Sequence, residues 1–267
     1  MLSLPPKIAL ITGANSGIGF ELARQLLQNG TYHVLLGSRT MSKGTAAVSN
    51  LQERNLPGTI ELLQLDVRND EHISEAARRI AAQHGRLDVL VNNAAVALPE
   101  GATERERLSA AFDTNATGPW LLAKALMPLL WKGGEARIIN ISSGAGSIGR
   151  RLFAESPMYK IQAVPYRASK VALNMMSACM HVEFGLVVGQ VDGWKADAEE
   201  DGGDEKKGVK VFCYDPGFTV SNLGPHNKAD FGARSAEETV RSIMEIVDGK
   251  RDEEAGRFIH NSGEYPW

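Results

Sequence analysis

Apolar runs of strand type alternate with stretches of helical spacing along almost the whole of this 267-residue chain. The strand-like runs lie at residues 7–12, 32–37, 60–65, 88–91, 136–141, 209–213 and 257–260. The helical stretches lie at 18–29, 42–54, 70–84, 104–131 (with a bend expected near Pro119), 166–184 and 235–247. Apolar strands separated by helices indicate a parallel sheet that is covered on both faces. Right-handed crossovers then predict a doubly wound α/β sheet of about seven strands, with ligands bound just beyond the carboxyl ends of the strands.

Length and composition exclude several classes of protein. A doubly wound α/β chain of this length is predicted to form one domain over residues 1–267. The net charge of −3 argues against nucleic acid and anionic membranes as partners. Two cysteines, no room for a signal peptide and no long apolar run predict a cytoplasmic protein without disulfides. No His-Glu-x-x-His motif occurs, so the sequence predicts no metal site.

The turn after the first strand-like run is rich in glycine and reads Thr-Gly-Ala-Asn-Ser-Gly-Ile-Gly over residues 12–19. Glycines allow a tight turn and let a pyrophosphate approach the backbone without meeting a side chain. The helix that follows offers free N–H groups and a positive dipole end to that anion. The predicted cofactor contacts in this turn are Gly13, Asn15, Ser16, Gly17, Ile18 and Gly19.

The end of the second strand-like run indicates which nicotinamide cofactor is preferred. An Asp or Glu about twenty residues beyond such a turn usually contacts the ribose hydroxyls of NAD. Here Ser38 and Arg39 stand at that point, and no acid is present. A guanidinium can pair with the 2′-phosphate of NADP, whereas a carboxylate would repel it. Arg39, with Lys43 assisting, therefore predicts a preference for NADPH, although an exposed arginine at a loop start is the plain alternative.

Five further segments, in order along the chain, strengthen this interpretation. They are Asp66-Val67, Asn92-Asn93-Ala94-Ala95, Ile141-Ser142-Ser143, Tyr166-x-x-x-Lys170 and Pro216-Gly217. Together with residues 12–19 they resemble the motifs of the single-domain short-chain dehydrogenases/reductases, and the placement of Arg39 is most similar to the carbonyl-reductase side of that family. The resemblance implies a Rossmann domain that binds NADP(H) and covers nearly the whole chain. The cofactor contacts that it implies are Asp66, Val67, Asn93, Ala94, Lys170, Pro216, Gly217, Thr219 and Ser221.

Tyr166 and Lys170 are the predicted centre of the chemistry. They are four residues apart on an expected helix and so share one face. A nearby ammonium lowers the pKa of a phenol, which suits an acid that must give up its proton. Tyr159 is a competing tyrosine without a lysine four residues on. The resemblance implies that Lys170 also holds the nicotinamide ribose.

Two more catalytic residues are implied by the family pattern. A serine hydroxyl can donate to the substrate oxygen as charge develops there, and the pattern favours Ser143 over its neighbour Ser142. Side chains alternate along a strand, so only one of these serines can face the cleft well. Asn115 matches the asparagine that, in the family, anchors a proton-relaying water to the lysine.

The sequence departs from the family pattern at several points. Ala95 replaces the usual glycine after the fourth strand, and the stretch from Ser143 to Tyr166 is longer than usual. We expect inserts near residues 147–165 and 189–208, the second containing an acidic surface loop at 192–207, and a substrate lid near 221–234. An insert before the tyrosine covers the dimer face in similar carbonyl reductases, so monomer, homodimer and tetramer all remain open.

These observations predict an NADPH-dependent oxidoreductase that reduces a ketone or aldehyde, with Tyr166 as general acid. The substrate is expected to be a small hydrophobic carbonyl compound. The aromatic candidates for its pocket are Phe153, Tyr159, Trp120 and Phe218. One alternative is an NAD(P)-dependent alcohol dehydrogenase working in the oxidative direction. The other is a non-catalytic NADPH-binding sensor or scaffold, although such proteins generally lose the tyrosine or the lysine.

Overall fold

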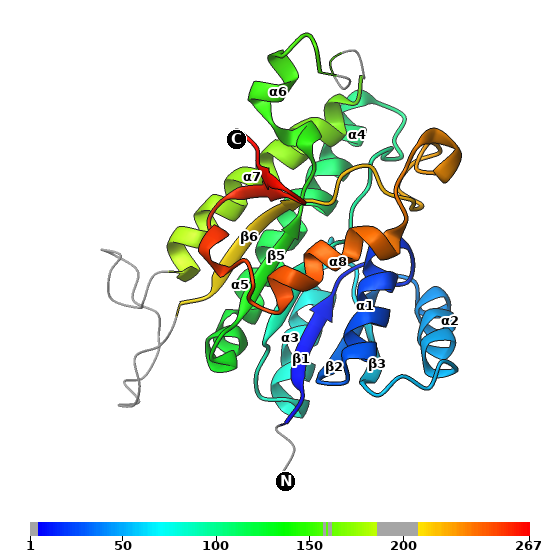
Figure 1. Ribbon diagram of the computed structural model, residues 1–267, viewed down its shortest axis with the longest axis vertical. Helices are drawn as coiled ribbons and strands as arrows, with labels where there is room; N and C mark the ends of the chain where they lie inside the picture. Colours follow the sequence, from blue (N-terminus) through cyan, green and yellow to red (C-terminus); the bar gives the residue numbers. More distant parts are fainter. Residues whose placement is uncertain (1–4, 157–158, 160–161, 186–207) are drawn as a thin grey trace.

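The computed structural model describes residues 5–156, 159, 162–185 and 208–267, and these residues build a mostly parallel sheet (Figure 1). The strands are β1 (Lys7–Ile11), β2 (Tyr32–Ser38), β3 (Thr59–Gln64), β4 (Val89–Asn92), β5 (Arg137–Ile141), β6 (Lys210–Asp215), β7 (Phe258–His260) and β8 (Gly263–Glu264). Their order is β3-β2-β1-β4-β5-β6-β7-β8. The doubly wound fold is therefore confirmed. The eighth strand, which the sequence did not predict, is a two-residue segment that turns back antiparallel to β7.

Helices cover both faces of this sheet (Figure 1). They are α1 (Gly17–Asn29), α2 (Met41–Gln52), α3 (Asp70–Gln83), α4 (Glu104–Phe112), α5 (Gly118–Leu130), α6 (Ile148–Leu152), α7 (Val164–Gly185) and α8 (Ala236–Val247). Buried residues of α3, α5 and α7 pack on one face. Those of α1, α2 and α8 pack on the other. No helix of the described residues combines the length and the apolar composition needed to cross a bilayer.

The central strand β1 shows why the apolar runs are continuous. Its side chains alternate between the two faces, so Ile8 and Leu10 enter one core while Ala9 and Ile11 enter the other. Each of these four side chains is buried. Full burial of a large aliphatic side chain contributes about 1.5–3 kcal/mol. A strand without a polar face is therefore stabilised only between two helical layers.

The helix expected over residues 104–131 is divided by a π-helical turn at Asp113–Thr117. This turn ends two residues before Pro119, near which the sequence predicted a bend, and Pro119 occupies the first turn of α5. Such turns are frequent at functional sites. A Cβ at Gly118 would lie 2.5 Å from the carbonyl oxygen of Val67, so only glycine allows this close approach of the helix to the loop after β3.

The two predicted inserts differ in how much of them can be seen. The first contains the short helix α6, which follows a 3₁₀ turn at Gly144–Gly146. The second, near 189–208, lies outside the described residues except for Gly208, and so does the whole acidic loop at 192–207. Strand order reverses between β1 and β4, so the carboxyl ends of these strands are where a doubly wound sheet binds its ligand.

Candidate active site

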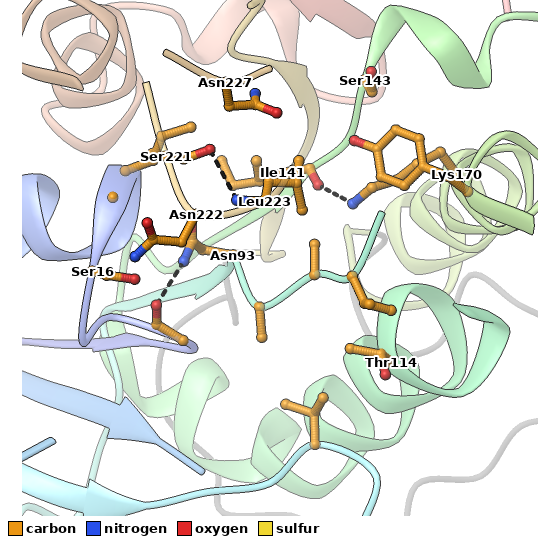
Figure 2. A pocket seen from close by; sticks show the side chains of 18 of the residues that line it. Ser16, Asn93, Thr114, Ile141, Ser143, Lys170, Ser221, Asn222, Leu223 and Asn227 are labelled. Atoms are coloured by element: carbon orange, nitrogen blue, oxygen red, sulfur yellow. Dashed lines mark hydrogen bonds between the residues drawn. The ribbon is translucent and has the colours of Figure 1, made fainter. Parts of the chain in front are cut away.

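A cleft of about 470 Å³ lies at the carboxyl ends of the strands. Most of the predicted site residues line it: Gly13, Asn15, Ser16, Gly17, Ile18, Arg39, Asp66, Val67, Asn93, Ala94, Ser143, Tyr166, Lys170, Pro216, Gly217, Thr219 and Ser221. Figure 2 shows Ser143 and Lys170 on one side of this cleft, with Ser16 and Ser221 on the other. Gly19, Ser38 and Asn115 were predicted as site residues but do not line it.

The Gly-rich turn has the conformation that its glycines permit. Gly13 and Gly17 have positive φ angles of 62° and 58°. A Cβ on Gly13 would lie 3.0 Å from Cα of Ala94, and one on Gly17 would lie 3.2 Å from Cβ of Ser221. Within the described chain, no side chain caps the N-terminus of α1 and no acid lies in its first turn. The free N–H groups and the positive end of the helix dipole thus face the cleft, which fits a bound diphosphate.

Asn93 ties this turn to the end of β4. Its side-chain Nδ2 donates to the carbonyl of Thr12 at 2.8 Å, while the Thr12 hydroxyl accepts from the backbone N–H groups of Asn93 and Ala94, each at 3.0 Å. Gly19 lies behind this contact, because a Cβ there would be 2.5 Å from Asn93 Nδ2. The predicted contact of Gly19 with a cofactor stays a prediction. Its missing side chain leaves room for the Asn93 side chain that holds the turn.

Ser38 likewise does not line the cleft, and its predicted contact with a cofactor stays a prediction. It is fully buried, and its hydroxyl donates to the carbonyl of Thr40 at 2.9 Å, so it shapes the turn after β2 and does not reach the cleft. Arg39 is exposed at the cleft edge, and no hydrogen bond or ion pair of its guanidinium is found among the described residues. Lys43 does not line the cleft.

A second arginine, Arg68, lines the same end of the cleft and was missed from the sequence. Its Nη2 lies 2.8 Å from Oδ2 of Asp66, and its Nε donates to Oδ1 of Asp66 at 3.1 Å. Hydrogen bonds from Arg68 hold the pKa of the Asp66 carboxyl below its usual value, although partial burial opposes this. The negative charge of Asp66 is therefore neutralised by Arg68, and the positive charge of the exposed Arg39 remains available to an anion.

Tyr166, Lys170 and Ser143 meet at the other end of the cleft. The ammonium of Lys170 lies 5.8 Å from the centre of the Tyr166 ring and donates to the carbonyl of Ile141 at 2.7 Å (Figure 2). Lys170 is only 2% exposed. Residues four apart on α7 therefore face the cleft together, as the sequence predicted, and a proton donor lies beside a buried positive charge.

Burial controls the proton affinities of this pair. It raises the pKa of Tyr166 to about 12, with the Asp215 carboxylate adding to the rise and a hydrogen bond with Ser143 opposing it. The lowering of this pKa that the sequence analysis expected from the Lys170 ammonium is therefore not found, because burial of the phenol outweighs it. Burial also lowers the pKa of Lys170 to about 8, against the attraction of Cys213 and Asp215. The phenol is thus protonated at neutral pH, and the lysine titrates close to the physiological range.

The two adjacent serines have different partners. The Ser142 hydroxyl is buried and donates to Oδ1 of Asn174 at 2.5 Å. The Ser143 side chain interacts with the Tyr166 hydroxyl and accepts from the N–H of Ala145 at 3.2 Å. Of the two, Ser143 is therefore the one placed beside the phenol, whereas Ser142 joins β5 to α7.

Asn115 lies beneath the cleft, in the π-helical turn, and is fully buried. Its Nδ2 donates to the carbonyl of Val96 at 2.8 Å and to the Ser169 hydroxyl at 2.9 Å, and its Oδ1 accepts from the Val96 N–H at 2.8 Å. Ser169 in turn donates to the backbone carbonyl of Tyr166. Asn115 thus fastens the loop after β4 to the helix that carries the tyrosine, and its part in a water relay stays a prediction.

The predicted aromatic pocket residues do not line the cleft. Trp120 packs in the core, where its ring stacks on Phe184 with centroids 5.8 Å apart. Tyr159, Phe153 and Phe218 are exposed. The cleft is lined instead by smaller apolar residues: Val96, Leu98, Pro99, Ala110 and Leu223. Of these, only Leu223 lies in a segment that was predicted to face the substrate, the lid near 221–234. The turn that follows β4 could have suggested the position of Val96, but not its inward orientation.

Asp215 is a further cleft residue that the sequence analysis overlooked. It is 7% exposed, ends β6 directly before Pro216, and accepts from the N–H of Gly217 at 2.8 Å. A carboxyl group at the end of a strand in a doubly wound sheet was the available signal. The segment 221–234, predicted as a lid, places Ser221, Leu223 and Asn227 against the cleft, and its mobility stays a prediction.

The sequence model of a family described as short chain dehydrogenase matches residues 7–187. This chain belongs to the short-chain dehydrogenase family. Members are oxidoreductases that act on CH–OH or C=O groups and use NAD(P) cofactors. The family thus accounts for a Gly-rich turn, a tyrosine and a lysine around one cleft.

Two fungal short-chain dehydrogenases illustrate how far the similarity extends. The chain is 33% identical over 280 residues to short-chain dehydrogenase anuI of Penicillium roqueforti, with 100% of both chains covered. It is 32% identical over 276 residues to short-chain dehydrogenase/reductase tropE of Talaromyces stipitatus, with 97% of this chain and 96% of the relative covered. The likeness therefore includes the region after residue 187, which the family model does not match.

Solved structures show the same fold. The NADPH-bound carbonyl reductase from chicken fatty liver superposes with a TM-score of 0.77 at 23% identity and covers 99% of this chain and 100% of its own. Carbonyl reductase Sniffer of D. melanogaster superposes with a TM-score of 0.75 at 24% identity and the same coverage. At this level of identity the likeness establishes the fold of this short-chain dehydrogenase and not its substrate.

Proposed function

We propose that this protein is an NADPH-dependent reductase that converts a ketone or aldehyde to an alcohol. The observation that carries the proposal is the meeting of Tyr166, Ser143 and Lys170 at one end of a cleft whose other end holds the Gly-rich turn and Arg39. Bound NADPH would supply the hydride. The chain itself therefore has to bind and orient the cofactor and the substrate, and has to donate a proton to the carbonyl oxygen. The residues present fit that division of labour.

Tyr166 would donate its proton to the carbonyl oxygen as negative charge develops there. Burial keeps the phenol protonated at neutral pH, because it raises the pKa of Tyr166 to about 12. The protonated form is the one that reduction consumes, whereas oxidation of an alcohol would begin from the phenolate. A positioned acid of this kind typically contributes about 10²–10⁴-fold to a rate.

Ser143 would act on the carbonyl oxygen of the substrate, and Lys170 would act on Tyr166, the proton donor. The Ser143 hydroxyl, next to the phenol, can donate a hydrogen bond to the developing oxyanion. The buried Lys170 ammonium stabilises the phenolate that remains after proton transfer, since an opposite charge nearby favours an ionised group. The Ile141 carbonyl, the hydrogen-bond acceptor of Lys170, fixes where that positive charge lies.

The preference for NADPH rests on Arg39. Its exposed guanidinium lines the cleft at the end of β2 and makes no hydrogen bond or ion pair among the described residues, so a 2′-phosphate can pair with it. The NADPH bound to the chicken carbonyl reductase is consistent with this assignment. The apolar residues Val96, Leu98 and Leu223 favour a hydrophobic carbonyl substrate.

The proposal is tested by incubating the protein with a panel of aliphatic and aromatic ketones and aldehydes and following loss of the reduced nicotinamide absorbance. We expect turnover of hydrophobic carbonyl compounds with NADPH and little with NADH at equal concentration. Alcohol formation is verified by chromatography. Alcohol oxidation that is faster than carbonyl reduction at pH 7 would contradict the assigned direction.

A further inference from the structure

Three side chains from distant parts of the sequence meet at the end of the sheet away from the cleft. His33 is the second residue of β2, Glu61 belongs to β3, and His84 is the C-cap of α3. One ring nitrogen of each histidine and one carboxylate oxygen of Glu61 all lie within 4.8 Å of one another. All three residues are partly buried. The cluster plays no part in the proposed reduction, because it lies towards the amino-terminal ends of β2 and β3.

His33 has one ring nitrogen fixed and the other unused. Its Nδ1 lies 2.7 Å from the hydroxyl of Thr59, and Thr59 is the residue of β3 that pairs with His33. Its Nε2 is buried and has no hydrogen-bond partner among the residues that the structure describes. A buried polar atom without a partner is costly and calls for a physical explanation. A histidine that binds a metal through one nitrogen commonly uses the other to contact an oxygen, as His33 does with Thr59.

Glu61 and His84 have a separation that suits two ligands of one ion. His84 Nε2 lies 3.4 Å from Glu61 Oε1, which is long for a hydrogen bond between these groups. Two atoms that each bind a tetrahedral ion at about 2.0–2.1 Å lie about 3.3 Å apart. Arg79 Nη2 lies 3.4 Å from the other oxygen, Oε2, which leaves Oε1 facing the histidines.

We propose that His33, Glu61 and His84 bind a transition-metal ion, with Zn²⁺ as the preferred ion. Two imidazoles and one carboxylate are ligands that Zn²⁺ takes readily, and a water completes four-coordination. Closure would require the His33 ring to move towards the other two ligand atoms, which already lie at the right separation. The ion would join β2, β3 and the end of α3, and so would stabilise this edge of the sheet. Sequence analysis predicted no metal site, since these ligands come from three segments without a local motif.

The test uses untagged, metal-free protein of the full chain, titrated calorimetrically with ZnCl₂. Wild type is expected to bind one equivalent, and at about one hundred times the dissociation constant its Tm should rise by roughly 5–10 °C. Glu61→Gln and His84→Gln each remove one ligand and should weaken binding at least about tenfold and abolish the Tm rise. His226→Gln removes an exposed histidine away from the cluster and should change neither result.

A further variant keeps the test decisive where a ligand substitution prevents folding. Thr59→Val leaves all three ligands in place and removes the contact to His33 Nδ1, so it should lower zinc affinity by about 10–100-fold. Two outcomes overturn the proposal. One is wild type that binds no zinc at micromolar concentration. The other is zinc binding that persists unchanged in Glu61→Gln, His84→Gln and Thr59→Val, because the ion would then lie elsewhere on the surface.

Discussion

The ammonium of Lys170 is held 2.7 Å from the carbonyl oxygen of Ile141, so the helix that carries the tyrosine is fastened to the end of β5. This contact keeps a positive charge almost fully buried behind the Tyr166 ring. A buried ammonium is costly, and the chain accepts this cost at the point where the proposed phenolate would form. The placement of Lys170 thus connects the packing of α7 to the chemistry of the cleft.

The burial of Lys170 predicts a specific dependence of stability on pH in the absence of cofactor. In the unfolded chain the lysine keeps its proton up to a pKa of 10.5, whereas burial lowers the pKa of the folded form to about 8. Between these values the unfolded state binds more protons, so the folded state gains stability as the pH rises. The free energy of unfolding of wild type, relative to Lys170→Met, should rise by about 3 kcal/mol from pH 8 to 10.5.

Urea unfolding of both proteins across this pH range measures the difference. Lys132→Met removes an exposed lysine and serves as the control, whose pH dependence should run parallel to that of wild type. Parallel curves for wild type and Lys170→Met would mean that the folded lysine has an ordinary pKa. The electrostatic argument for the Tyr166 and Lys170 pair would then be lost.

Arg39→Ala should separate the two nicotinamide cofactors. Loss of a charge-assisted hydrogen bond costs about 1.5–3 kcal/mol, which corresponds to roughly a tenfold to hundredfold weaker binding of NADPH. NADH lacks the 2′-phosphate and should bind the variant as it binds wild type. Fluorescence titration measures both affinities. Arg241→Ala, which removes an exposed arginine on α8, is the control, and equal losses for both cofactors in Arg39→Ala would refute the 2′-phosphate contact.

Gly17→Ala should impair cofactor binding beyond its effect on stability. Gly17 has φ of 58°, and an added Cβ would press on Ser221 at the cleft. Gly85→Ala is a matched control, because Gly85 has φ of 70° and no atom of the described residues lies within 4 Å of an added Cβ. Both variants should lose about 1–2 kcal/mol of stability through backbone strain. Only Gly17→Ala should weaken NADPH binding, by about tenfold or more, and equal affinities of the two variants would contradict the assigned role of this turn.

The sequence predicted the fold well because its signals are local and repeated. The continuous apolar pattern of residues 7–11 could only be satisfied between two helical layers, as the burial of Leu10 and Ile11 shows. The short β8 was missed because Gly263 and Glu264 carry no strand signal. The π-helical turn around Asn115 was missed because its backbone geometry depends on the packing of Gly118 against Val67.

The sequence predicted the site residues whose position follows from the local backbone or from a motif. It predicted less well the residues whose orientation depends on tertiary packing. Glycine at positions 13 and 17 is explained by the positive φ angles of the turn itself. Glycine at position 19 is explained by the position of Asn93, which lies directly after β4. Trp120 looked like a pocket aromatic but stacks on Phe184, because its helix turns that face towards the core. Arg68 was missed for a similar reason, since its orientation depends on Asp66.

The measurement that tests the central claim most directly compares Tyr166→Phe with wild type. The rate of carbonyl reduction and the affinity for NADPH are both measured on the same preparation of each protein. The substitution removes one hydroxyl and keeps the ring that lies over Lys170. We predict NADPH affinity within about twofold of wild type and carbonyl reduction slower by about a hundredfold or more. Reduction at the wild-type rate by Tyr166→Phe would show that the proton comes from elsewhere and would contradict the account.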